Sequence, residues 1–278
     1  MKNYSILIAL FALLLLSTSC SETYKFTLET PKTVAINEVA TFKVSENNNR
    51  PIDSVQFFVN GKQIPGNKLT TTYNTSNLGF GRHFVVALSF YPEKTNKTKG
   101  SFEIFPTEKA IIYGYKIINT YPHDSTAYTQ GLEYHNGYLY ETTGRRGQSS
   151  LRKVKVTTGK VLQKVALANK YFGEGMTIID DKIHWLTWQN KKGFIYDLNT
   201  FKQEKTFKYG KSKEGWGLTH NEIELIKSDG THKIWFLDPT THKEKRSIQV
   251  YTKGRALDNL NELEFIDGKI YANKYLNS

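Results

Sequence analysis

The chain has 278 residues, which is enough for two domains, and its net charge is +12. The 17 Tyr and 16 Phe, together with a scarcity of long amphipathic stretches of helical period, favour strands over helices. The lysines are scattered along the chain and do not gather into the basic, aromatic-rich face of a nucleic-acid-binding protein, so we expect a solvated surface that attracts an anionic envelope and no nucleic acid partner.

The first residues indicate export. Lys2 precedes the apolar run from Ile6 to Leu16, which is too short for an ordinary membrane span and leads through small residues to Cys20. Residues 1–19 are therefore predicted to be a lipoprotein signal peptide, and Cys20, the single cysteine, is predicted to carry the lipid. Ser17 stands where leucine is usual in such signals, so the alternative is plain secretion with an incidental cysteine. Lipidation would anchor the protein in the cell envelope, at the outer membrane or the periplasmic face.

Residues 20–106 contain short stretches in which apolar and polar residues alternate, separated by polar turns. Such stretches occur at 40–44, 55–59 and 83–88, and Asn60-Gly61 supplies a tight turn. This pattern resembles an immunoglobulin-like β-sandwich. No cluster of His, Asp, Glu or Ser suggests chemistry here, so we interpret the segment as a spacer or docking domain.

From residue 107 to residue 278 the sequence repeats itself. Thr158, Thr200 and Thr241 occupy equivalent turns between apolar strands and recur at intervals of 42 and 41 residues. A period near 40 with several short strands per unit is typical of the blades of a β-propeller. We therefore expect an all-β protein whose second domain is a propeller.

A second repeated element runs in phase with the first. Gln130, Glu174, Trp216 and Asn261 each open a unit, at spacings of 44, 42 and 45 residues. Equivalent positions of blades related by rotation form a ring around the axis, so these four side chains should converge. In three units a glycine follows, which lets backbones approach closely. The alternative is that these residues merely begin each blade and differ in exposure.

The motifs around these positions resemble those of the plant and bacterial glutaminyl-peptide cyclotransferase family. In chain order they are Tyr128-Thr129-Gln130-Gly131-Leu132, Tyr171-Phe172-Gly173-Glu174-Gly175-Met176-Thr177, Gly193-Phe194-Ile195-Tyr196-Asp197, Gly215-Trp216-Gly217-Leu218 and Leu260-Asn261-Glu262-Leu263-Glu264. The resemblance does not extend to the N-terminal sandwich. It implies a five-bladed propeller and a metal-independent acyltransferase that needs no cofactor. Such an enzyme converts the N-terminal glutamine of peptides and proteins to pyroglutamate and releases ammonia.

The resemblance also implies a set of site residues. Glu174 would be the general acid/base. The substrate-binding residues would be Tyr128, Gln130, Phe172, Trp188, Trp216, Asn261 and, in place of a family tryptophan, Tyr275. Taken without the resemblance, Trp188 would be assigned to packing, as Trp185 is, and Arg145-Arg146 to a solvated turn.

The chemistry of cyclisation independently favours a lone carboxylate. The α-amine must lose a proton and the departing ammonia must gain one, and one group can do both. Burial among aromatic rings raises the pKa of a glutamate and makes transfer in each direction feasible. Glu174, beside Phe172, meets this description if the ring forms; otherwise it is a surface glutamate at a strand end.

About four blades are expected within the sequence, so we expect a C-terminally truncated, incomplete propeller of the five-bladed type, and a monomer. The alternative is that a partner supplies the missing wall. One alternative function is a non-catalytic envelope lipoprotein that binds peptides or glycans. Another is a propeller lactonase or lyase, which would need a ring of metal-binding acids or histidines. The predicted ring holds one acid, Glu174, and so favours the cyclotransferase.

Overall fold

The computed structural model describes residues 23–66, 68–92, 94–108, 111 and 113–275. The predicted signal peptide and Cys20 lie outside these residues. Within them the protein is built of strands, and the helical element found is one 3₁₀ turn, Thr75–Asn77. No helix in this part of the chain is long and apolar enough to cross a membrane. The expectation of an all-β protein is confirmed.

The chain divides into two compact units. The first ends at Ile104 and the second begins at Phe105, while residues 78–81 group with the second.

The first unit holds two sheets, in the orders β1-β3-β6 and β2-β8-β7-β4-β5. Its strands are β1 (Phe26–Glu29), β2 (Thr33–Ala35), β3 (Val39–Glu46), β4 (Ser54–Val59), β5 (Lys62–Ile64), β6 (Thr70–Asn74), β7 (Gly81–Tyr91) and β8 (Lys94–Phe105).

Alternation of buried and exposed residues along β3, β4 and β7 gives each sheet one apolar face. The two faces pack together, since the rings of Phe42 in β3 and Phe102 in β8 lie 5.5 Å apart and are almost fully buried. Asn60 and Gly61 both have positive φ, at 50° and 83°, which forms the predicted tight turn between β4 and β5.

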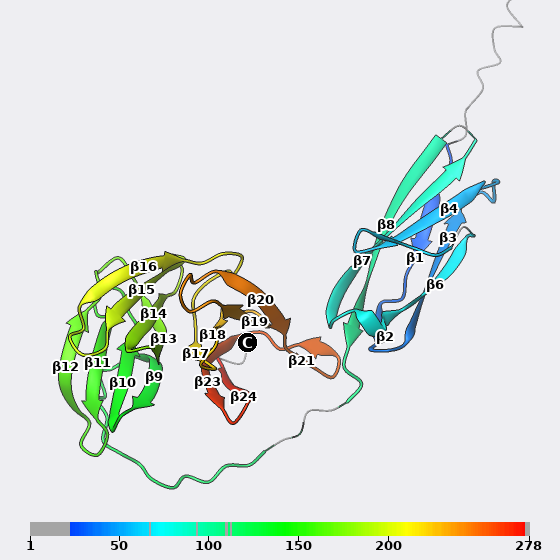
Figure 1. Cartoon of the computed structure of the whole chain (residues 1–278). Coiled ribbons are helices and arrows are strands. Elements are labelled where there is room, and N and C mark those ends of the chain that lie inside the picture. The colour runs from blue at the N-terminus through cyan, green and yellow to red at the C-terminus, as the bar shows by residue number, and fades with distance from the viewer. Residues whose placement is uncertain (1–22, 67, 93, 109–110, 112, 276–278) are drawn as a thin grey trace, which may run out of the picture. The chain divides into compact units, whose positions relative to one another are not determined.

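The second unit contains three four-stranded antiparallel sheets that follow one another along the chain (Figure 1). The first sheet is β9 (Thr129–His135), β10 (Tyr138–Thr143), β11 (Ser150–Lys155) and β12 (Lys160–Ala166). The second is β13 (Gly173–Ile179), β14 (Lys182–Thr187), β15 (Lys192–Asp197) and β16 (Gln203–Lys208). The third is β17 (Leu218–His220), β18 (Leu225–Ser228), β19 (Lys233–Leu237) and β20 (Glu244–Gln249). Two pairs follow: β21 (Tyr251–Thr252) with β22 (Arg255–Ala256), and β23 (Leu260–Ile266) with β24 (Lys269–Lys274).

The arrangement of the sheets is propeller-like. The first strand of each sheet contacts the first strand of the next, in the series β9, β13, β17 and β23. The repeated threonines mark the turn into the fourth strand of each sheet. The Asp197 carboxylate accepts hydrogen bonds from the backbone and hydroxyl of Thr200, at 2.9 and 2.8 Å, and Asp238 holds Thr241 in the same way. The repeated threonines therefore lie in equivalent turns, and the four ring residues lie at or just before the first strand of successive sheets.

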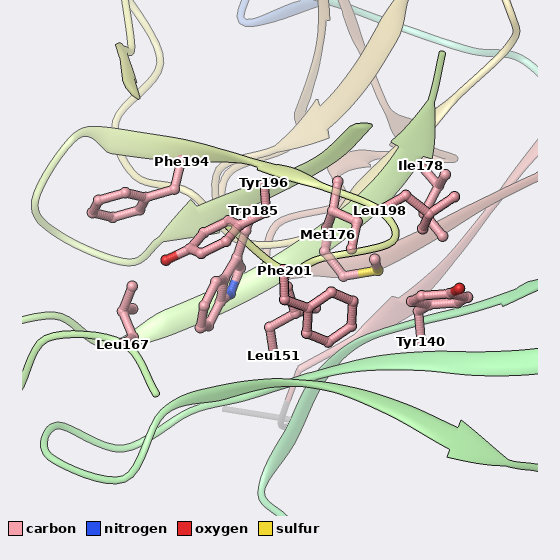
Figure 2. Close-up of a cluster of buried hydrophobic side chains, with 11 residues drawn as sticks. Tyr140, Leu151, Leu167, Met176, Ile178, Trp185, Phe194, Tyr196, Leu198 and Phe201 are labelled. Atoms are coloured by element: carbon pink, nitrogen blue, oxygen red, sulfur yellow. The ribbon is translucent and has the colours of Figure 1, made fainter. Parts of the chain in front are cut away.

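A buried cluster joins the first and second sheets (Figure 2). Trp185 and Leu151 lie in it fully buried, and Met176 of the inner strand β13 is nearly so. The assignment of Trp185 to the core is confirmed. Burial of these large side chains fixes β13 against β10 and β11, and with it the position of the residues at its start.

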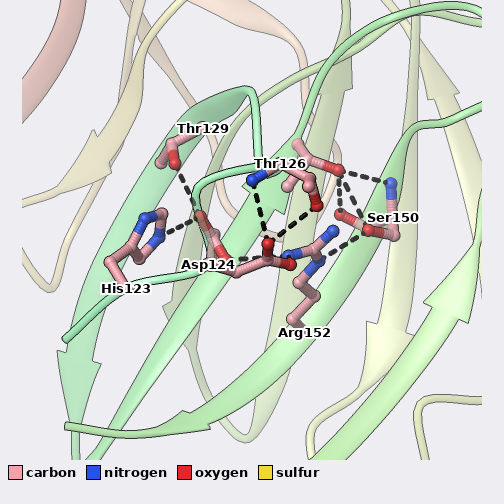
Figure 3. Close-up of polar contacts among 8 residues, drawn as sticks. His123, Asp124, Thr126, Thr129, Ser150 and Arg152 are labelled. Atoms are coloured by element: carbon pink, nitrogen blue, oxygen red, sulfur yellow. Dashed lines mark hydrogen bonds and ion pairs between the residues drawn. The ribbon is translucent and has the colours of Figure 1, made fainter. Parts of the chain in front are cut away.

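A polar network ties the segment before β9 to the first sheet (Figure 3). The buried carboxylate of Glu141 accepts hydrogen bonds from His123, at 2.8 Å, and from the Thr129 hydroxyl, at 2.6 Å. Arg152 donates to Asp124 at 2.9 Å. These bonds hold both ends of the stretch 123–129 and so orient the residues that enter β9.

Candidate active site

A cavity of about 380 Å³ lies where the inner strands of the second unit begin. Its lining residues are Tyr128, Gln130, Arg145, Phe172, Glu174, Trp188, Trp216, Asn261 and Tyr275. The structure thus brings together all eight residues that the sequence suggested for catalysis and substrate binding, and it adds Arg145. The individual roles of these residues remain predictions.

Close contact between inner strands explains why the four ring residues meet. The Gly175 amide donates to the Trp216 carbonyl at 2.8 Å. A Cβ atom on Gly175 would lie 2.5 Å from that oxygen and 2.6 Å from the Leu218 nitrogen, and one on Gly131 would lie 2.6 Å from the Met176 nitrogen. Only glycine permits this approach, which places the side chain before each glycine at the same cavity.

Among the residues that the structure describes, Glu174 is the one acid that lines the cavity, and it is 6% exposed. No hydrogen bond to its carboxylate is formed by the residues described, whereas its backbone carbonyl accepts one from Thr142 at 2.7 Å. Burial, and secondarily the charge of Glu214, raises the pKa of Glu174 well above its usual value of 4.5. The group is therefore suited to accept and to return a proton at higher pH than an exposed glutamate.

Aromatic rings form the walls of the cavity on either side of Glu174. Phe172 meets Trp188 at 5.5 Å and Tyr128 at 6.3 Å, both edge to face, and Trp216 meets Tyr275 at 5.8 Å in the same geometry. The pKa of Tyr128 is raised, first by its hydrogen bond with Tyr275 and then by burial. The walls are largely aromatic, and the side-chain amides of Gln130 and Asn261 add polar groups to the lining.

Glu214 supports the cavity and was missed by the sequence analysis. Its carboxylate accepts hydrogen bonds from the indole nitrogens of Trp188, at 2.6 Å, and Trp216, at 2.8 Å. The sequence repeat did contain a signal for Glu214. It stands two residues before the ring residue of its unit, at the position that Tyr128 and Phe172 occupy in theirs.

The prediction that Arg145 lies in a solvated turn is confirmed, since the residue is exposed between β10 and β11. It also lines the cavity, with its guanidinium carbon 4.7 Å from the centre of the Tyr128 ring. The Gly144 amide at the start of this turn donates to the Tyr128 carbonyl, which brings Arg145 to the cavity lining, and sequence periodicity does not reveal this contact. Arg146 does not line the cavity and donates to Gln189 at 3.2 Å.

Glu174 is the acid among the four ring positions, as expected, and further carboxylates lie next to these positions in the chain. Besides Glu214, Glu262 follows Asn261 in β23, and both its carboxylate oxygens are buried. Its pKa is raised well above 4.5, first by burial and then by the charges of Glu264 and Glu174. The charge of Glu174 therefore contributes to the raised pKa of Glu262 in another inner strand.

Comparison with known proteins agrees with the site. The profile of the glutamine cyclotransferase family matches residues 85–278. A glutaminyl-peptide cyclotransferase of Arabidopsis thaliana is 41% identical over 159 residues, which cover 57% of this chain and 49% of the relative. The crystal structure of Myxococcus xanthus glutaminyl cyclase superimposes with a TM-score of 0.53 at 33% identity, over 57% of this chain and 66% of that one. The chain thus spans about half the length of the Arabidopsis relative and less than two thirds of the bacterial one.

Proposed function

The chain belongs to the glutamine cyclotransferase family, and we propose that it acts as a glutaminyl-peptide cyclotransferase on peptides and proteins with an N-terminal glutamine. The observation that carries this proposal is the buried carboxylate of Glu174, which is the one acid among the described residues that line the aromatic cavity. The Arabidopsis protein that this chain resembles is itself a glutaminyl-peptide cyclotransferase.

In the proposed reaction the α-amine of the substrate attacks the side-chain carboxamide carbon. A C–N bond forms, and Glu174, as carboxylate, takes a proton from the amine. When the tetrahedral intermediate collapses, the C–N bond to the former amide nitrogen breaks, and the protonated Glu174 returns the proton to that nitrogen. Ammonia leaves, a five-membered lactam remains, and Glu174 is again a carboxylate.

The aromatic walls contribute by restricting the substrate. The glutamine side chain must fold back on its own amine, and a rigid cup formed by Phe172, Trp188 and Trp216 limits the other conformations. The amides of Gln130 and Asn261 can hydrogen-bond the carboxamide oxygen or the amine.

The test is incubation of the purified protein with a glutaminyl dipeptide amide, following both ammonia and the pyroglutamyl product. We expect one ammonia per product and the same rate with a chelator present. Saturable binding of the peptide without either product would instead favour a non-catalytic envelope protein that binds peptides.

Replacing Glu214 with glutamine should change the pH dependence of turnover. Glu174 must be ionised to accept the amine proton, so kcat/KM should rise with pH through the raised pKa of Glu174. Removing the charge of Glu214 lowers that pKa, and the midpoint of the rise should move to lower pH. A kcat/KM–pH profile of Glu214→Gln beside the unaltered protein measures the shift.

Glu204→Gln is the matched control, because it removes the same charge from β16 at a residue paired with Lys182 and remote from the cavity lining. Its profile should be unchanged. Equal midpoints in the Glu214→Gln variant and the unaltered protein would show that Glu214 has no electrostatic effect on the catalytic acid.

The remaining architecture belongs to the same proposal. We infer that the first unit is an immunoglobulin-like sandwich, that the second is a propeller of the five-bladed type, and that a monomer is anchored in the envelope through lipid on Cys20. The alternating sheets of the first unit and the blade-like sheets of the second support the first two points. Incorporation of labelled fatty acid, lost in Cys20→Ser, tests the third.

A further inference from the structure

The turn that carries Arg145 is held in a defined conformation at the edge of the cavity. Arg145 has a positive φ of 75°, and its carbonyl accepts hydrogen bonds from the Gln148 amide at 3.0 Å and the Ser149 hydroxyl at 2.9 Å. The preceding Gly144 donates to the Tyr128 carbonyl at 2.7 Å. The backbone of Arg145 is therefore fixed relative to the cavity wall.

The guanidinium of Arg145 is held above the Tyr128 ring, at 4.7 Å from its centre. It forms no ion pair with a carboxylate of the described residues, although it is exposed and fully charged. By contrast Arg152, in the adjoining strand β11, is buried and paired with Asp124. The N–H groups of the Arg145 guanidinium are thus available to bind a ligand at the edge of the cavity.

A substrate bound for cyclisation must place its first residue inside the cavity, near Glu174. The rest of the peptide then leaves through the opening and passes the exposed lining residues, which among the described residues are Tyr128, Arg145 and Tyr275. Of these three, Arg145 is the charged one. A planar guanidinium stacked on an aromatic ring is well suited to bind a carboxylate through paired N–H donors.

We propose that Arg145 is a specificity-determining residue that binds a substrate carboxylate just after the N-terminal glutamine. The preferred substrates are peptides with Asp or Glu at the second or third position, and short peptides whose free C-terminus falls there. This inference rests on the proposed cyclotransferase function.

Three substrates distinguish the sources of the carboxylate: a Gln-Asp peptide amide, a Gln-Lys peptide amide and a Gln-Ala dipeptide with a free C-terminus, each compared with Gln-Ala amide. At low salt we expect kcat/KM to be about fivefold higher for the acidic substrates than for the neutral one, the size of a good exposed ion pair, and lowest for Gln-Lys. Added salt should reduce these ratios.

Arg145→Glu should reverse the order, so that the Gln-Lys amide is turned over better than the Gln-Asp amide. The control is Arg146→Glu, which changes the net charge equally one residue away, at a side chain outside the cavity lining. It should keep the order and the ratios of the unaltered protein.

The possible failures are separable. Absence of turnover with every peptide would overturn the proposed function itself. Turnover without a charge preference, or with a preference that Arg146→Glu reverses as effectively as Arg145→Glu, would overturn the assignment of Arg145. A preference for the free C-terminus without one for Gln-Asp would restrict the site to the terminal carboxylate and refute the part concerning acidic side chains.

Discussion

Replacing Glu174 with glutamine should lower kcat/KM for a glutaminyl dipeptide by about a thousandfold, in the middle of the range for loss of a general acid/base. Glutamine has nearly the same shape, so the aromatic walls and the hydrogen bond from Thr142 to the backbone of residue 174 should persist. What is lost is the group that can take the amine proton and return it to ammonia. Turnover is measured by ammonia release at several pH values.

The same substitution should make the protein more stable at neutral pH. Burial raises the pKa of Glu174 in the folded state, so the folded protein holds this proton more tightly than the unfolded chain does. In the unfolded chain the pKa of this glutamate is about 4.5. As the pH rises above that value, the free energy of unfolding therefore falls, because the buried carboxyl group resists ionisation in the folded state. Glu174→Gln removes this effect, and its gain in free energy of unfolding should disappear as the pH falls below that value.

Glu133→Gln provides a matched control for the turnover measurement. Glu133 is another glutamate of an inner strand, and burial raises its pKa to about 7, but it does not line the cavity. Turnover should survive in this variant. Activity retained in Glu174→Gln would remove Glu174 from the mechanism, whatever its pKa.

Gly175→Ala is expected to destabilise the second unit by about 3 kcal/mol, at the upper end of the usual cost of overpacking. The added methyl would lie 2.5 Å from the Trp216 carbonyl oxygen and 2.6 Å from the Leu218 nitrogen, and both are backbone atoms that cannot rotate away. Either β13 and β17 separate or the hydrogen bond from Gly175 to Trp216 is broken. Both outcomes also displace Glu174 from Trp216, so activity should fall with stability.

Tryptophan fluorescence during urea unfolding isolates this effect, because all four tryptophans lie in the second unit, at positions 185, 188, 216 and 235. Gly114→Ala is the control, since nothing lies within 4 Å of a Cβ built there and its φ is not positive. It should change the free energy of unfolding by less than about 0.5 kcal/mol. Similar midpoints for the two variants would contradict the close approach of the inner strands.

The sequence by itself determined the all-β class, the repeat and the ring of four residues. These were accessible because rotationally related blades place equivalent positions around one axis, so the spacing of Gln130, Glu174, Trp216 and Asn261 carries three-dimensional information. The alternation of residues in the first unit and the turn at Asn60 depend only on local geometry, and they too could be predicted.

The tertiary structure decided what surrounds the ring. Arg145 lines the cavity because its turn is bonded to the Tyr128 backbone through Gly144, and the Glu214 carboxylate accepts hydrogen bonds from both Trp188 and Trp216. The carboxylate of Glu262 is buried by packing between inner strands. Each of these contacts joins segments that are distant in the sequence and meet only on folding. A repeat period specifies which positions are equivalent, but it does not specify which side chains fill the space between them.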